Sequence, residues 1–196
     1  MNQKPERWSE SVIVANMWLD PDQDPREAGD DPVGERATCE RYLRDYRLTI
    51  ELKCQGLDAA QMASRPVPPS TLSLLGLLRH LGEVERDWRN WITAGEPAGR
   101  IYWPAGSDFE EVRPDPAQVS QALRILHEEQ DATDRLLAGF EDLGQRAGRE
   151  QVVIRDLMVH RIEEYARHSG HADLLRECFD GRVGQWRSTL PTVLAA

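Results

Sequence analysis

A glutamate and two histidines are spaced along one stretch of the sequence as metal ligands on a helix would be. The stretch EEYARHSGHADLLRE, residues 163–177, places Glu164 four residues before His168, and His171 three residues after it. On a helix such spacings bring Cβ atoms to within about 5–6 Å of one another, so the side chains can share one ion. A solvent-facing helix surface can carry the same pattern, so the direction of this stripe decides between the two interpretations.

The stripe falls on the apolar side of the helix that we expect over about 151–180. At about 100° per residue, and counted from His160, the three side chains lie within an arc of about 80°. The same arc holds Val153, Leu157, Leu175 and Cys178, whereas the opposite side holds Glu163, Arg167, Asp173 and Glu177. A carboxylate and imidazoles on a buried face are costly unless they are hydrogen-bonded, paired or bound to a metal.

A further histidine, His80, lies on the apolar face of another expected helix, over about 71–93. A lone histidine in such a place is more often a satisfied core residue than a ligand. Together with His168 and His171 it makes a set of three imidazoles, which suits Zn²⁺, Ni²⁺ or Fe²⁺ with coordination positions left open. The alternative is a hydrogen-bonded polar layer that fixes the register of the helices. Position alone assigns no role to His127 or His160.

Four amphipathic helices must position these side chains. Apolar residues recur at three- and four-residue intervals over about 34–55, 71–93, 116–139 and 151–180. Ser70 is the expected N-cap of the second helix, Asp115 followed by Pro116 begins the third, and Gly181 ends the fourth. No strand pattern of convincing length occurs. The sequence therefore predicts an all-α fold, a four-helix bundle.

The first 33 residues differ from the rest. They contain Trp8 and Trp18 and the Asp- and Pro-rich run LDPDQDPREAGDDP. We expect an extended N-terminal arm over 1–33 whose aromatic residues pack on the helical domain, residues 34–196; the alternative is a disordered tail. The long connector between the second and third helices holds Tyr102 and Trp103, and long ordered loops are often functional.

Composition narrows the classes of function. The chain has 196 residues with 40% hydrophobic and 30% charged residues, which suits one globular domain. A formal net charge of -10 argues against nucleic acid as a partner. Three cysteines without a C-x-x-C pair (Cys39, Cys54 and Cys178) are typical of reduced thiols. No run approaches the roughly 20 apolar residues of a membrane span. We expect a cytoplasmic protein with no membrane partner.

Two motifs resemble a known family. PVPPSTLSLLGLLRHLGEVERDW, residues 66–88, and VHRIEEYARHSGHADLLRE, residues 159–177, resemble the DinB-like (DinB/YfiT-type) superfamily, most closely an actinobacterial mini-circle-protein branch. The resemblance covers about Gly34 to Gly184. It implies a four-helix bundle in which one histidine of the second helix and two of the last bind a divalent metal, often zinc or nickel.

The resemblance carries over to His80 and His168 directly, and less directly to the third ligand. Many relatives place the last two histidines four residues apart, whereas here Ala172 stands at that position. His171 is the third ligand that the resemblance implies, and Glu164 is the alternative. If Glu164 is not a ligand, it is a candidate catalytic residue that orients an imidazole or takes a proton.

Characterised relatives are metal-dependent enzymes that use a low-molecular-weight thiol, such as mycothiol or bacillithiol, and dimers are common. The resemblance therefore implies a homodimeric thiol S-transferase that acts on small electrophiles. Trp88, Trp91 and Trp103 are candidates for lining the mouth of its pocket, with ordinary core packing the alternative for the first two.

A non-catalytic stress-response or binding module, with a structural metal or none, is the alternative function. A closed site of four ligands would favour that role, and an open site of three would favour chemistry.

Overall fold

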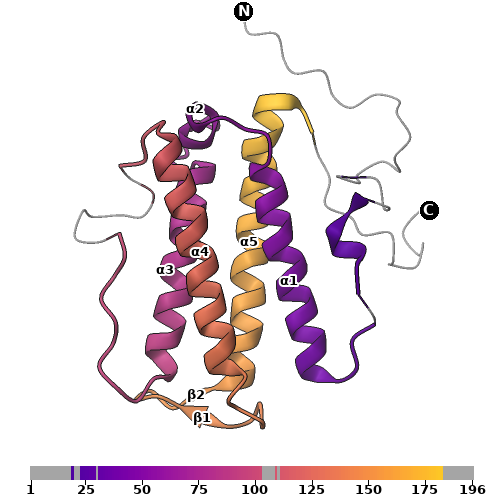
Figure 1. The fold of residues 1–196 in the computed structure, drawn as a ribbon, viewed down its shortest axis with the longest axis vertical. Coiled ribbons are helices and arrows are strands. Elements are labelled where there is room, and N and C mark those ends of the chain that lie inside the picture. The colour runs from indigo at the N-terminus through magenta and orange to yellow at the C-terminus, as the bar shows by residue number, and fades with distance from the viewer. Residues whose placement is uncertain (1–18, 20–22, 30, 103–108, 110, 183–196) are drawn as a thin grey trace, which may run out of the picture.

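The fold is seen in a computed structural model that describes residues 19, 23–29, 31–102, 109 and 111–182. Four long helices form the predicted all-α bundle: α1 (Glu35–Cys54), α3 (Leu74–Ile92), α4 (Pro116–Leu137) and α5 (Ile154–Asp180). They run along the long axis of the molecule, with α3 packed on α4 and α1 on α5 (Figure 1). Apolar side chains from all four helices meet in one core, which includes Leu77, Leu126, Ile50 and Leu175.

The ends of the helices follow local chemistry. Asp115 caps α4 as predicted, because its carboxylate accepts a hydrogen bond from the Ala117 backbone N–H at 2.9 Å, and Pro116 has no backbone N–H that would need an acceptor. Gly181 ends α5 in the left-handed conformation, with φ 73°. The helix bounds that periodicity predicted agree with the structure to within three residues at each end.

The prediction that Ser70 is the N-cap of the second helix was wrong. The helix α3 begins at Leu74, and Ser73 is its N-cap, accepting a hydrogen bond from the Gly76 N–H at 3.0 Å. Ser70 instead accepts from the N–H of Leu72 at 3.2 Å. Both serines have the chemistry of a cap, and Ser73 lies where the chain passes into the core, since it is fully buried.

Three short elements were not expected from the sequence. The helix α2 (Ala59–Ala63) has a capping box formed by Asp58 and Gln61. Strands β1 (Arg146–Ala147) and β2 (Val152–Val153) pair antiparallel, with Arg146 opposite Val153, and lead into α5. Elements of two residues are too short to produce a periodic pattern.

Part of the N-terminal segment lies against α1. A 3₁₀ turn, η2 (Pro25–Glu27), holds the buried ion pair of Asp24 and Arg26, whose Nη2 and Oδ2 atoms are 2.6 Å apart. Arg26 also donates to Thr49 Oγ1 on α1 at 3.0 Å. Trp8 and Trp18 lie outside the described residues, so the predicted packing of the arm's aromatic residues, and the boundary at residue 33, stay predictions.

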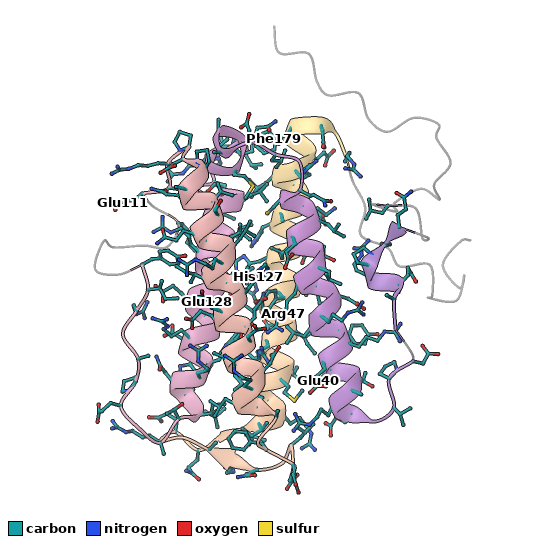
Figure 2. The ribbon with its side chains drawn as sticks, viewed as in Figure 1. Glu40, Arg47, Glu111, His127, Glu128 and Phe179 are labelled. Atoms are coloured by element: carbon teal, nitrogen blue, oxygen red, sulfur yellow. The ribbon has the colours of Figure 1, made fainter. Side chains whose placement is uncertain are left out.

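A buried cluster of charges links the four helices. Glu85 of α3 accepts hydrogen bonds from Arg47 of α1 at 2.8 Å, from Arg161 of α5 at 3.0 Å and from the Tyr165 hydroxyl at 3.0 Å. Asp134 of α4 accepts from the same two arginines, at 2.6 and 2.7 Å. Figure 2 shows Arg47 between α1 and α4. None of the described helices is long and apolar enough to cross a membrane.

Candidate metal centre

Three side chains from two helices converge on one point of the bundle. His80 comes from α3, and Glu164 and His168 come from α5, one turn apart. The Nε2 atoms of His80 and His168 each lie 3.0 Å from the same oxygen, Oε1 of Glu164. One potential ligand atom from each residue lies within 4.8 Å of the other two. We call these three side chains the His–Glu–His group.

The chemistry of the group fits a divalent transition metal. Two imidazole nitrogens and one carboxylate oxygen are a donor set that Zn²⁺ uses in open, three-ligand sites, and imidazole also suits Ni²⁺. His168 is buried, whereas His80 and Glu164 are half-buried, so the group reaches the surface on one side. A site of this kind can hold an ion and still admit a small molecule.

The protonation states in the group are those that a metal requires. Burial lowers the pKa of His168 to about 4, so its imidazole is neutral at pH 7. Burial raises the pKa of Glu164, but the hydrogen bonds and the electrostatic interactions with His80 and His168 together outweigh this effect, so the pKa lies below its ordinary value. A neutral imidazole and an ionised carboxylate are both ready to act as ligands.

His171 lies on the other side of the His168 ring. Its Nδ1 atom is 3.1 Å from Nδ1 of His168, and the two rings meet edge to face with their centroids 5.1 Å apart. A hydrogen bond between two imidazole nitrogens needs a proton on one and a lone pair on the other. Among the described residues, the cluster of potential metal-ligating atoms that lie within 4.8 Å of one another includes an atom of Glu164 and none of His171. Which three residues hold a metal stays a prediction.

Phe109 covers part of the His–Glu–His group. Its ring stacks on that of His80, with 4.7 Å between the centroids, and lies 6.5 Å from the ring of His168. Its backbone passes close to α3 at Gly76, where an added Cβ would lie 3.4 Å from the Phe109 Cα. Sequence reasoning missed Phe109. The only available signal was its place in the long connector.

The candidate pocket tryptophans gather one turn away, around His160. Trp88 is buried at 1% exposure, and its ring centroid is 5.9 Å from that of His160. Trp91 is 44% exposed, and its ring stacks on that of the same histidine with 5.9 Å between the centroids. Trp103 lies outside the described residues. His127, labelled on α4 in Figure 2, is exposed, and its Nε2 atom lies 2.9 Å from a carboxylate oxygen of Glu51.

Comparison with known proteins adds two matches. The model of a family described as Mycothiol-S-transferase matches residues 38–181, a range that contains His80, Glu164, His168 and His171. A solved structure, described as the conserved protein of a locus from Enterococcus faecalis, is 16% identical and covers 74% of this chain and 94% of its own, with a TM-score of 0.44. No curated protein matches the chain.

Proposed function

Since the chain belongs to the mycothiol S-transferase family, within the DinB-like superfamily, we propose that it is a metal-dependent enzyme that transfers a low-molecular-weight thiol to a small electrophile. Mycothiol is the proposed thiol, and a bacillithiol-type thiol is the alternative. The observation that carries the proposal is the bond of one Glu164 oxygen to both His80 Nε2 and His168 Nε2.

His80, Glu164 and His168 are the proposed ligands of a zinc or nickel ion. Such an ion, when bound, favours the thiolate form of a thiol at neutral pH, and the thiolate is the nucleophile. In the transfer, the thiol sulfur forms a bond to an electrophilic carbon as the leaving group departs, and the thiol proton is released. Three protein ligands leave positions open, which supports chemistry over a closed structural site.

The surrounding residues hold this group in place. His168 would hold the ion through Nε2, which would leave the ring proton on Nδ1, 3.1 Å from Nδ1 of His171; His171 would then accept that proton and fix the tautomer and the orientation of the ring. Phe109 excludes water from the outer face of His80. In the alternative ligand set of His80, His168 and His171, the ring of His171 must first leave His168 Nδ1.

Thiol consumption tests the proposal. Purified protein is loaded with zinc or nickel and given mycothiol and monochlorobimane, an electrophile whose adduct is fluorescent. We expect adduct formation above the uncatalysed rate in wild type, and loss of that excess in Glu164→Gln. Glu163→Gln, an exposed neighbour on the same helix, is the matched control and should keep the activity. The proposal would be overturned if metal-loaded protein formed adduct no faster than the uncatalysed reaction with both mycothiol and bacillithiol, whichever of several electrophiles was used.

A further inference from the structure

Three aromatic rings meet where the last turns of α3 contact the first turns of α5: Trp88, Trp91 and His160. The Trp88 ring meets that of His160 edge to face, with 81° between the two planes. The Trp91 ring stacks on the same imidazole, with 26° between the planes. We call these three side chains the aromatic platform. The proposed metal ligands do not include any of them.

The aromatic platform is buried on one side and open on the other. Trp88 lies in the core, whereas Trp91 is 44% exposed and the His160 side chain is 42% exposed. Single exposed apolar side chains are common and need no explanation. Here, however, the two exposed rings are stacked on each other, so their open surface is already held in one orientation. Rigid aromatic rings of this kind bind flat ligands at a low cost in conformational entropy.

The backbone that carries Trp91 is fixed by its neighbours. The turn between β1 and β2 packs on the end of α3 at Gly148, where an added Cβ would lie 1.7 Å from the Trp91 carbonyl oxygen. On the next residue of α3, the Asn90 amide exchanges two hydrogen bonds with the Ala98 backbone, at 2.9 and 3.1 Å. The start of the connector is thereby tied to α3. The aromatic platform therefore stands on a rigid part of the fold, as a preorganised binding surface does.

The aromatic platform lies one helical turn from the His–Glu–His group. His160 precedes Glu164 by four residues, so the two side chains share a side of α5 and start about 6 Å apart along the helix axis. On α3, Val84 lies four residues after His80 and four before Trp88, and it is half-buried. An apolar side chain thus stands between the metal centre and the platform on the facing helix.

We propose that the aromatic platform binds the electrophile of the transfer, and that this electrophile is a flat, conjugated and largely apolar molecule about the size of two fused rings. Its rings lie against Trp91 and His160, and its reacting carbon lies toward the open positions of the metal. A molecule of this size spans the single helical turn between His160 and Glu164. Stacking selects the shape of the ring system more than its functional groups. This inference rests on the proposed function, since it names the class of electrophile for the same centre.

Kinetics with two electrophiles test the proposal. Trp91→Ala removes the exposed ring, Trp91→Phe keeps a smaller one, and Tyr42→Ala, which removes an exposed ring from α1, is the matched control. We expect KM for the bicyclic monochlorobimane to rise about two- to tenfold in Trp91→Ala and to recover in Trp91→Phe. Metal content, and kcat/KM for iodoacetamide, which has no ring, should not change. An unchanged KM for monochlorobimane, or an equal loss with both electrophiles, would overturn the proposal.

Direct binding separates this proposal from the proposed function. A bimane that carries methyl in place of chloromethyl cannot react, so its binding is followed by ligand-observed NMR without any thiol. Binding that weakens in Trp91→Ala but not in Tyr42→Ala supports the aromatic platform, even if no thiol transfer is found. Transferase activity in a protein that does not bind this bimane keeps the proposed function and rejects the platform. Binding that is equally strong in wild type and Trp91→Ala also rejects it.

Discussion

The Nδ1 atom of His171 lies 3.1 Å from the Nδ1 atom of His168, on the side of the ring opposite Glu164. His168 is therefore contacted at both nitrogens. If its Nε2 binds a metal, only Nδ1 can carry the proton, and His171 is the acceptor. This relationship gives His171 a role that differs from that of a ligand, and the two roles predict different results.

Replacement of His171 by Ala should weaken metal binding without abolishing it. We expect the Kd for zinc to rise about 10- to 100-fold, the usual effect of losing a partner that orients a ligand. His171→Gln keeps an acceptor oxygen and should recover part of the affinity. A chelating dye in competition measures both values. Complete loss of metal in both variants would make His171 a ligand.

Glu164 should matter far more than its neighbour on the same helix. Glu164→Gln removes the negative charge and replaces one carboxylate oxygen by an NH2 group, so we expect less than a tenth of the wild-type metal content after reconstitution. Glu163→Gln changes an exposed residue and should retain full occupancy. Elemental analysis of the two proteins makes the comparison, and equal metal contents would exclude Glu164 as a ligand.

The buried charges around Glu85 should dominate stability. In Glu85→Ala, Arg47 and Arg161 lose their buried partner, and we expect the free energy of unfolding to fall by about 3–5 kcal/mol. Glu128→Ala breaks an exposed pair with Arg124 and should cost no more than about 0.5 kcal/mol. Urea denaturation measures both, and similar losses in the two variants would contradict this account.

Lys53 should make stability depend on pH in alkaline solution. Burial lowers its pKa to about 8 although Nζ lies 2.6 Å from Asp173, whereas in the unfolded chain it titrates near its ordinary value. At pH values between these two pKa values, the amine of Lys53 is protonated in the unfolded chain but not in the folded protein. The free energy of unfolding therefore rises with pH over this range, and this gain is lost as the pH falls through about 8.

The expected size of this change is about 3 kcal/mol, and Lys53→Met should remove it. Denaturation midpoints of both proteins between pH 7 and about 10.5 test the prediction. If the denaturation midpoint of the wild type changes with pH as little as that of the variant, the pKa of Lys53 is not lowered.

The bundle was predictable because its signals are local. Each helix carries its own three- and four-residue periodicity, and Asp115 and Gly181 act on the backbone next to them. The spacing of Glu164 and His168 is also local, since a helix of any origin brings them together. His80 could be picked out only because it interrupts an apolar face. The match to the family model confirms the family resemblance that was inferred from the two motifs together.

The rest depends on contacts between distant residues. Arg161 reads as a surface residue by type, yet it is buried because Glu85 and Asp134 come from other helices to meet it. Phe109 reaches His80 across 29 positions, and the sequence does not set it apart from other connector residues. Whether His171 or Glu164 is the third ligand stays a prediction. The homodimer and the cytoplasmic location stay predictions.

The most direct test of the metal centre is the metal content of protein purified without an affinity tag or chelator, beside a His168→Ala variant. Our account predicts about one equivalent of zinc or nickel in the wild type and almost none in the variant, as for other open sites with three protein ligands. A wild-type protein that contains no metal and takes up none on reconstitution would contradict it, and the His–Glu–His group would then be a hydrogen-bonded polar layer between α3 and α5.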